Sequence, residues 1–153
     1  MASGGGFPAR ISLVTIGARD LARLRAFYAA LGWREHPVSE DGIAFFRTGG
    51  AVLALYPYTD LADDAWLEAA GDQPEFRGMA LATNVETREG VDAAFEVAVA
   101  AGATVLKEPT DADWGGRSAY VADPEGNLWE IAWVPGATFD AIGGMTLPEP
   151  PAA

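Results

Sequence analysis

The segment from Asp123 to Ile131 contains the residues of this chain whose types and spacing could do chemistry. It begins as a tight turn, because Pro124 presets φ at the second turn position and Gly126 suits the fourth. The apolar strand predicted after the turn contains one acid, Glu130. A carboxylate inside an apolar strand is costly to bury unless it is paired. Its partner could be a metal, a donor group of a ligand, or a structural hydrogen bond.

The composition fits one globular domain and excludes several classes of site. The chain has 153 residues, of which 50% are hydrophobic and 21% charged. Its 22 acidic residues outnumber 10 basic ones, and the formal charge of −12 argues against a nucleic-acid partner while favouring a cationic ligand. The absence of cysteine excludes disulfides, thiolate metal sites and cysteine nucleophiles.

No targeting or membrane segment is expected. No apolar run approaches the roughly 18 residues that span a bilayer. Residues 1–6 lack the basic and apolar regions of a signal peptide. We therefore expect a cytoplasmic protein without a membrane partner.

Hydrophobic periodicity predicts the same order of elements twice within a single domain over residues 9–134. Each half is predicted to contain a strand, a helix and three further strands. The first module, 9–57, has its strands over 11–16, 33–38, 43–47 and 51–56 and its helix over 20–31. The second module, 77–134, has its strands over 78–85, 104–107, 117–121 and 128–133 and a helix that begins at Thr87.

Two segments lie outside this repeat. The connector, 58–76, is polar and acidic and is predicted to contain a short helix, because Leu61, Trp66 and Leu67 have helical spacing. The last stretch, 135–153, is rich in proline and glycine and is predicted to be an irregular tail.

This order resembles the vicinal oxygen chelate superfamily, which includes glyoxalase I, bleomycin-resistance proteins and extradiol dioxygenases. The motifs that resemble it are Asp20-Leu21, Phe27-Tyr28 and Leu31-Gly32-Trp33 in the first half, and the segment 123–131 in the second. The resemblance implies an α+β fold of two βαβββ modules whose curved mixed sheets enclose a cavity. It also implies a homodimer.

The resemblance further implies four metal-ligand positions, one on the first and one on the last strand of each module. In this sequence they correspond to Leu13, Ala54, Met79 and Glu130. Leucine and alanine have no donor atom, and a thioether suits only soft metals. One carboxylate does not make a catalytic metal site, so we expect no metal and no other cofactor. The only histidine, His36, matches none of these positions.

Strand alternation then predicts an apolar, aromatic cavity with one acid, in which a small molecule could bind. Either Phe45 or Phe46 should face it, and Trp114 is either a mobile lid or an anchor for its loop. The expected ligand-binding residues are Leu13, Thr15, Phe46, Ala54, Tyr56, Met79, Leu81, Trp114, Tyr120 and Glu130. The alternative is that these side chains fill a closed core.

Two functions are compatible with these residues. The first is a metal-free binding protein that sequesters an aromatic or cationic molecule, with Glu130 orienting a donor group. The second is a glyoxalase-like lyase or isomerase in which Glu130, with a pKa raised by burial, acts as a general base. A purely structural role for Glu130, as a hydrogen-bond partner of the backbone or of Tyr120, is the third reading.

Overall fold

The computed structural model describes residues 6–152 and has an α+β fold with two separate sheets. Residues 1–5 and Ala153 lie outside the described range. Residues 1–6 are the segment in which no signal peptide was expected, so most of that segment is not described. The first module places its three strands in the order β1-β3-β2, with β1 parallel and β2 antiparallel to β3. Its elements are β1 (Leu13–Ala18), α1 (Leu21–Ala30), β2 (Ala44–Arg47) and β3 (Val52–Pro57).

The second module has four strands in the order β4-β7-β6-β5. Strand β4 is parallel to β7, and the other pairs are antiparallel. Its elements are β4 (Leu81–Asn84), α3 (Arg88–Ala100), β5 (Thr104–Asp111), β6 (Arg117–Ala122) and β7 (Leu128–Trp133). The repeated order of strand, helix and strands agrees with the expected α+β class, although the sheets do not close into a barrel.

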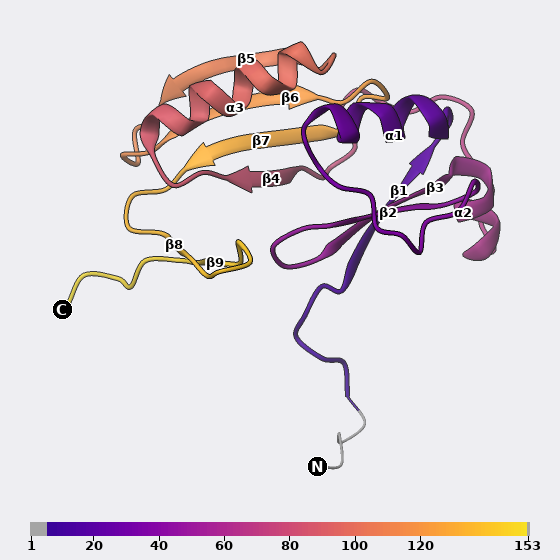
Figure 1. Ribbon diagram of the computed structural model, residues 1–153, viewed down its shortest axis with the longest axis horizontal. Helices are drawn as coiled ribbons and strands as arrows, with labels where there is room; N and C mark the ends of the chain where they lie inside the picture. The colour runs from indigo at the N-terminus through magenta and orange to yellow at the C-terminus, as the bar shows by residue number, and fades with distance from the viewer. Residues whose placement is uncertain (1–5, 153) are drawn as a thin grey trace.

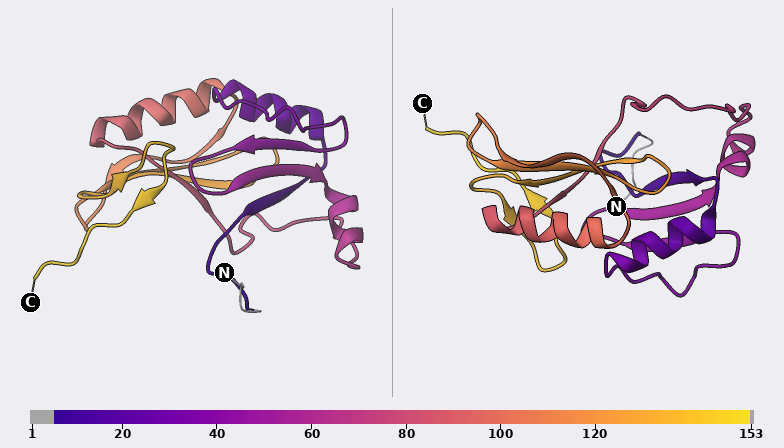
Figure 2. Two further views of the ribbon diagram at one scale, coloured as in Figure 1. Left: turned by 60° about the horizontal axis from the view of Figure 1, so that its bottom comes forward. Right: turned by 90° about the horizontal axis from the view of Figure 1, so that it is seen from above.

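Helices α1 and α3 lie end to end over one side of the two sheets (Figure 1; Figure 2, left). Helix α2 (Tyr58–Asp64) packs beside Gly17, at one end of the other side of the first sheet. The side chain of Asp20 caps α1 by accepting a hydrogen bond from the Arg23 N–H, and Thr87 caps α3 in the same way through Gly90. Apolar side chains pack between helices and sheets in two clusters, one in each module. We call the side of the sheets that α1 and α3 do not cover the helix-free face, although α2 reaches its end at Gly17.

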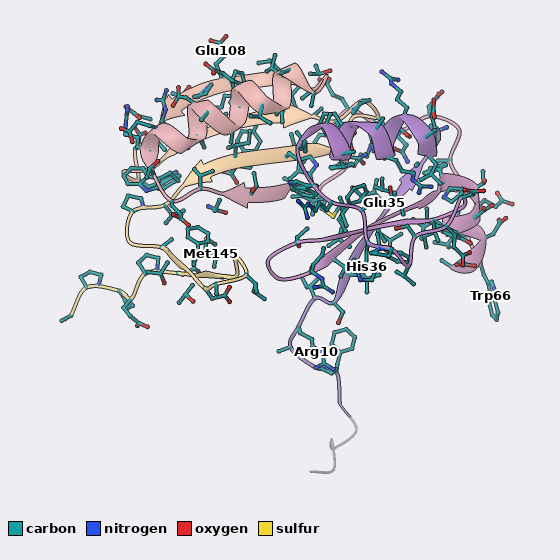
Figure 3. The ribbon with its side chains drawn as sticks, in the orientation of Figure 1. Arg10, Glu35, His36, Trp66, Glu108 and Met145 are labelled. Atoms are coloured by element: carbon teal, nitrogen blue, oxygen red, sulfur yellow. The ribbon has the colours of Figure 1, made fainter. Side chains whose placement is uncertain are left out.

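The first module differs from its prediction at residues 33–38, which form no continuous strand. Only Glu35 bridges to Phe46, and the His36 N–H donates to the Phe45 carbonyl at 2.7 Å. Pro37 has no N–H and cannot extend this ladder. In the connector, α2 (Tyr58–Asp64) is shorter than expected, and Trp66 is 95% exposed and extends away from the molecule (Figure 3).

The composition predicted an irregular C-terminal segment, but part of this segment forms strands. Strands β8 (Thr138–Phe139) and β9 (Met145–Thr146) form a hairpin that lies near the β2–β3 turn (Figure 1). The Asp140 side chain holds the hairpin turn by accepting from the N–H groups of Ile142 and Gly144 at 3.0 and 2.8 Å. This side-chain-to-backbone pattern stabilises a turn in a glycine-rich segment.

The turn that begins at Asp123 joins the two modules. Tyr28 of α1 donates its hydroxyl to the Asp123 carboxylate at 2.7 Å, and the indole N–H of Trp129 donates to the Tyr28 oxygen at 3.0 Å. Glu125, two residues further on, accepts from the backbone N–H groups of Arg19 and Asp20 at 2.6 and 3.1 Å. We call Tyr28, Asp123, Glu125 and Trp129 the inter-module clasp.

Asp123 is buried, and its burial is compensated by four hydrogen bonds. Besides Tyr28, it accepts from the N–H groups of Glu125 and Asn127 and from the Asn127 side-chain amide, all between 2.8 and 2.9 Å. Burial, followed by the nearby Asp123 carboxylate, raises the pKa of Tyr28 well above its ordinary value, so the phenol remains a donor. The turn is therefore a structural link between the modules.

Within residues 6–152, no helix combines the length and the apolar character needed to cross a membrane.

Replacing Tyr28 by phenylalanine should destabilise the protein by about 1–3 kcal/mol, because it removes a bond to a buried carboxylate and leaves the Trp129 indole without its acceptor. Urea denaturation measures this loss. Tyr58→Phe is the matched control, since the Tyr58 hydroxyl makes no hydrogen bond within residues 6–152, and its change should stay below about 0.5 kcal/mol. Equal losses in the two variants would contradict the role of the clasp.

Candidate functional site

A cluster of polar side chains lies on the helix-free face of the second module. Glu130, in the middle of β7, is in register with Ala82 of β4 and Tyr120 of β6, so these three side chains point to the same side of the sheet. Lys107 of β5 is in register with Tyr120, and its ammonium lies 5.8 Å from the centre of the Tyr120 ring and 3.4 Å from the Ser118 hydroxyl. A carboxylate, a phenol, a hydroxyl and an ammonium thus lie on one face.

The surroundings of Tyr120 in this cluster change the pKa of its phenol. Burial, and then the charge of Glu130 and its contact with the phenol, raise the pKa of Tyr120 above its ordinary value. The phenol therefore stays protonated at neutral pH and can donate a hydrogen bond. Glu130 itself is half-buried, and its carboxylate can accept from Tyr120 or from a ligand. The cluster can hold a molecule that offers a donor group.

The helix-free face of the first module is apolar and aromatic. Thr15 of β1, Ala54 of β3 and Phe45 of β2 are in register across the sheet. Leu13 and Tyr56 continue this face along their strands. A hollow of about 220 Å³ lies here, and Leu13, His36 and Phe45 are among the residues that line it. His36 accepts a hydrogen bond from the Val38 N–H at 3.2 Å, which fixes its ring at this hollow.

Three residues expected in the cavity lie elsewhere. Phe46 is fully buried under α1 with Tyr28, and Leu81 packs against the same cluster because it is in register with Trp129 and not with Glu130. Met79 precedes β4, is exposed, and lines a small hollow with Leu81 and Leu128. Phe46 and Leu81 therefore lie on the side opposite to the predicted one. On β2 it is Phe45, in register with Ala54, that takes the predicted side, and alternation along β4 runs one residue out of step with the prediction for Leu81.

Trp114 lies in the turn between β5 and β6 and is half-exposed. Its ring covers the backbone of Gly116 so closely that a Cβ at this glycine would come within 1.9 Å of the ring. A glycine is needed here for this close approach. The contact favours the anchor interpretation of Trp114 over the mobile lid.

The donor set on the helix-free face does not fit the metal centre implied by the resemblance. Leu13 and Ala54 lie on this face and have no donor atoms. The resemblance implied Met79 as the first-strand position of the second module, but the β4 residue beside Glu130 is Ala82. Within residues 6–152, no three His, Cys, Asp or Glu side chains are grouped so that they could hold a metal ion.

Lys107 and Phe45 are site residues that sequence reasoning did not place. Lys107 is exposed, and its position next to Tyr120 depends on irregularities in β5 on both sides of Lys107, which strand alternation does not reveal. Phe45 could not be distinguished from Phe46 by composition, but the bridge from Glu35 to Phe46 and the burial of Phe46 settle which ring faces which side.

The comparisons with known proteins agree with this architecture. A family model described as the Glyoxalase/Bleomycin resistance protein/Dioxygenase superfamily matches residues 10–131. The comparison with curated proteins gave no match.

Three solved structures illustrate the likeness. A glyoxalase-related enzyme from Fulvimarina pelagi is 31% identical with a TM-score of 0.82, over 93% of this chain and 100% of that one. A glyoxalase/bleomycin resistance protein/dioxygenase family enzyme from Burkholderia phytofirmans PsJN is 29% identical with a TM-score of 0.68, over 82% and 99%. Lactoylglutathione lyase from Agrobacterium tumefaciens, 22% identical with a TM-score of 0.62 over 82% and 94%, shares the fold.

The family model spans both modules and ends within β7, so it includes the turn at Asp123 and the strand position of Glu130. This chain therefore belongs to the Glyoxalase/Bleomycin resistance protein/Dioxygenase superfamily.

Proposed function

We propose that this protein is a metal-free member of the superfamily that binds and sequesters a small aromatic or cationic molecule on its helix-free face. The observation that supports this most is the placement of Glu130 beside Tyr120, with Lys107 nearby, on a face without a metal-ligand set. The carboxylate would accept from a donor group of the ligand, and a charge-assisted hydrogen bond of this kind is among the stronger ones. The formal charge of −12 would attract a cationic ligand from solution.

The apolar face of the first module complements this polar cluster. Phe45 and Tyr56 contribute aromatic rings to this face, and Phe45 lines the hollow there with Leu13. Aromatic faces bind flat molecules by offset stacking. Together the two faces have the composition of a small-molecule site, which is mostly apolar with few polar groups.

A second candidate is a lyase or isomerase in which Glu130 acts as a general base. The observation that favours it is the protonated Tyr120 phenol next to the carboxylate. A neighbouring base and acid could remove a proton from one atom of a substrate and donate a proton to another. Turnover by the wild-type protein that is lost in Glu130→Gln, with binding retained, would favour this candidate over sequestration.

We further propose a cytoplasmic homodimer in which a second copy covers the helix-free face. Exposed apolar side chains gather around its first-module part, where Ile11 is 70%, Leu13 50% and Val38 61% exposed. Apolar groups concentrated on one face are typical of a protein interface. A second copy would enclose a ligand that the open face of one chain leaves in water.

Glu130→Gln should weaken binding of a cationic aromatic ligand about tenfold or more, since it removes the charge of the accepting group. Isothermal titration calorimetry with flat aromatic amines, and with bleomycin as one member of the panel, measures this. Glu108→Gln is the control, because it removes the same charge from an exposed position on β5, the edge strand of the same sheet (Figure 3).

The affinity should also be unchanged by a chelator such as EDTA. The proposed function is wrong if no compound of the panel binds, if Glu130→Gln binds as tightly as Glu108→Gln, or if the chelator abolishes binding.

Replacing Leu13 by glutamate should convert the proposed dimer to a monomer, because it places a charge in the apolar patch. Sedimentation equilibrium measures the mass, which for one chain is 16.0 kDa. Leu67→Glu introduces the same charge at an exposed leucine in the connector and should leave the dimer intact. A wild-type monomer at high micromolar concentration would exclude this mode of enclosure.

A further inference from the structure

A second cavity lies between the two modules, and Glu130, Tyr120 and Lys107 are not among its lining residues. Its volume is about 340 Å³, near the lower end of ligand sites. Its walls come from both modules and from the C-terminal hairpin, with Trp33 and Trp129 among the lining residues. These two rings meet edge to face at a centroid distance of 5.6 Å. No charged side chain lines this cavity, so it suits an uncharged molecule with an aromatic or apolar body.

One wall of the cavity is the free edge of β4. Strand β4 is the first strand of its sheet and pairs only with β7. The Val85 N–H donates to the Ala132 carbonyl, and alternate residues of a strand direct their backbone groups to opposite sides. Ala82 and Asn84 therefore direct their N–H and C=O groups away from β7, on the side of the cavity that both residues line.

This edge defines the ligand chemistry that the cavity can recognise. The carbonyl of Ala82 and the N–H of Asn84 are the two groups that one residue of a parallel neighbouring strand would use. No residue between 6 and 152 forms a strand on that side of β4. A ligand with an adjacent N–H and C=O on one edge, as in a lactam ring, can donate to the Ala82 carbonyl and accept from the Asn84 N–H at once.

The C-terminal hairpin covers the cavity. Phe139 of β8 and Met145 of β9 line it, and Met145 is labelled on the hairpin in Figure 3. The hairpin tip touches the β2–β3 turn so closely that a Cβ added at Gly49 would lie 2.5 Å from the carbonyl atoms of Gly143. A side chain at Gly49 must therefore shift the hairpin, because both neighbours are backbone.

We infer that this inter-module cavity is a binding site for an uncharged, flat lactam-type molecule, which pairs with the free edge of β4, lies against Trp33 and Trp129, and is covered by the C-terminal hairpin. The site is separate from Glu130 and its occupant is neutral, so the inference does not depend on the proposed function of the helix-free face.

The test uses the full-length protein and 2-quinolone, a neutral bicyclic lactam, as the probe. Calorimetry should give a dissociation constant on the order of 0.1 mM, a modest affinity for a ligand of this size. In ¹H–¹⁵N spectra, the indole signals of Trp33 and Trp129 should shift and that of the exposed Trp66 should not. N-methyl-2-quinolone keeps the flat body without the donor and should bind at least fivefold more weakly.

Gly49→Ala tests the cover, because it should displace the hairpin and weaken 2-quinolone binding at least fivefold. Gly42→Ala is the matched control, since a Cβ there meets nothing within 4 Å, and its binding should equal that of the wild type. Circular dichroism verifies that both variants are folded. No binding below 1 mM, equal binding of the N-methyl compound, or unchanged binding by folded Gly49→Ala would each overturn the inference.

Discussion

The hydrogen bond between Tyr28 and Asp123 is the interaction on which the arrangement of this molecule depends. Each module alone is a small sheet with one helix, and a small unit buries too little surface to be stable by itself. The bond joins the helix of one module to the turn before β7 of the other, and the Trp129 indole completes it from the sheet. Around it, Tyr28, Trp33 and Trp129 pack with centroid distances between 5.6 and 6.1 Å. The polar pair thus sits inside an aromatic junction that excludes water.

The same short segment, from Asp123 to Glu130, supplies both the junction and the candidate site. Strand alternation separates the two tasks, because Trp129 points to the helix side and Glu130 to the helix-free side. The clasp therefore fixes the position of β7, and β7 in turn fixes the position of Glu130 beside Tyr120. Leu13 and Ala54, two positions that the resemblance links to metal binding, have no donor atoms, whereas the residues that this segment supplies to the clasp are present.

Much of the fold follows from the sequence because it depends on local patterns. Apolar periodicity predicted both long helices, and Asp20 and Thr87 cap them in the structure. The candidate site was less predictable, because it depends on register. An apolar run over 78–85 does not reveal which residue pairs with Glu130, and the answer, Ala82, placed Leu81 in the core. The irregularities beside Lys107 and the long-range bond from Tyr28 to Asp123 leave no local signal in the chain.

The most direct test of the clasp is a double-mutant cycle with Tyr28→Phe, Asp123→Asn and the double variant, measured by urea denaturation. If the two side chains stabilise the junction through their shared bond, the coupling energy should be about 1–2 kcal/mol. Additive losses, within about 0.3–0.5 kcal/mol, would contradict the account and would assign each residue an independent role in its own module.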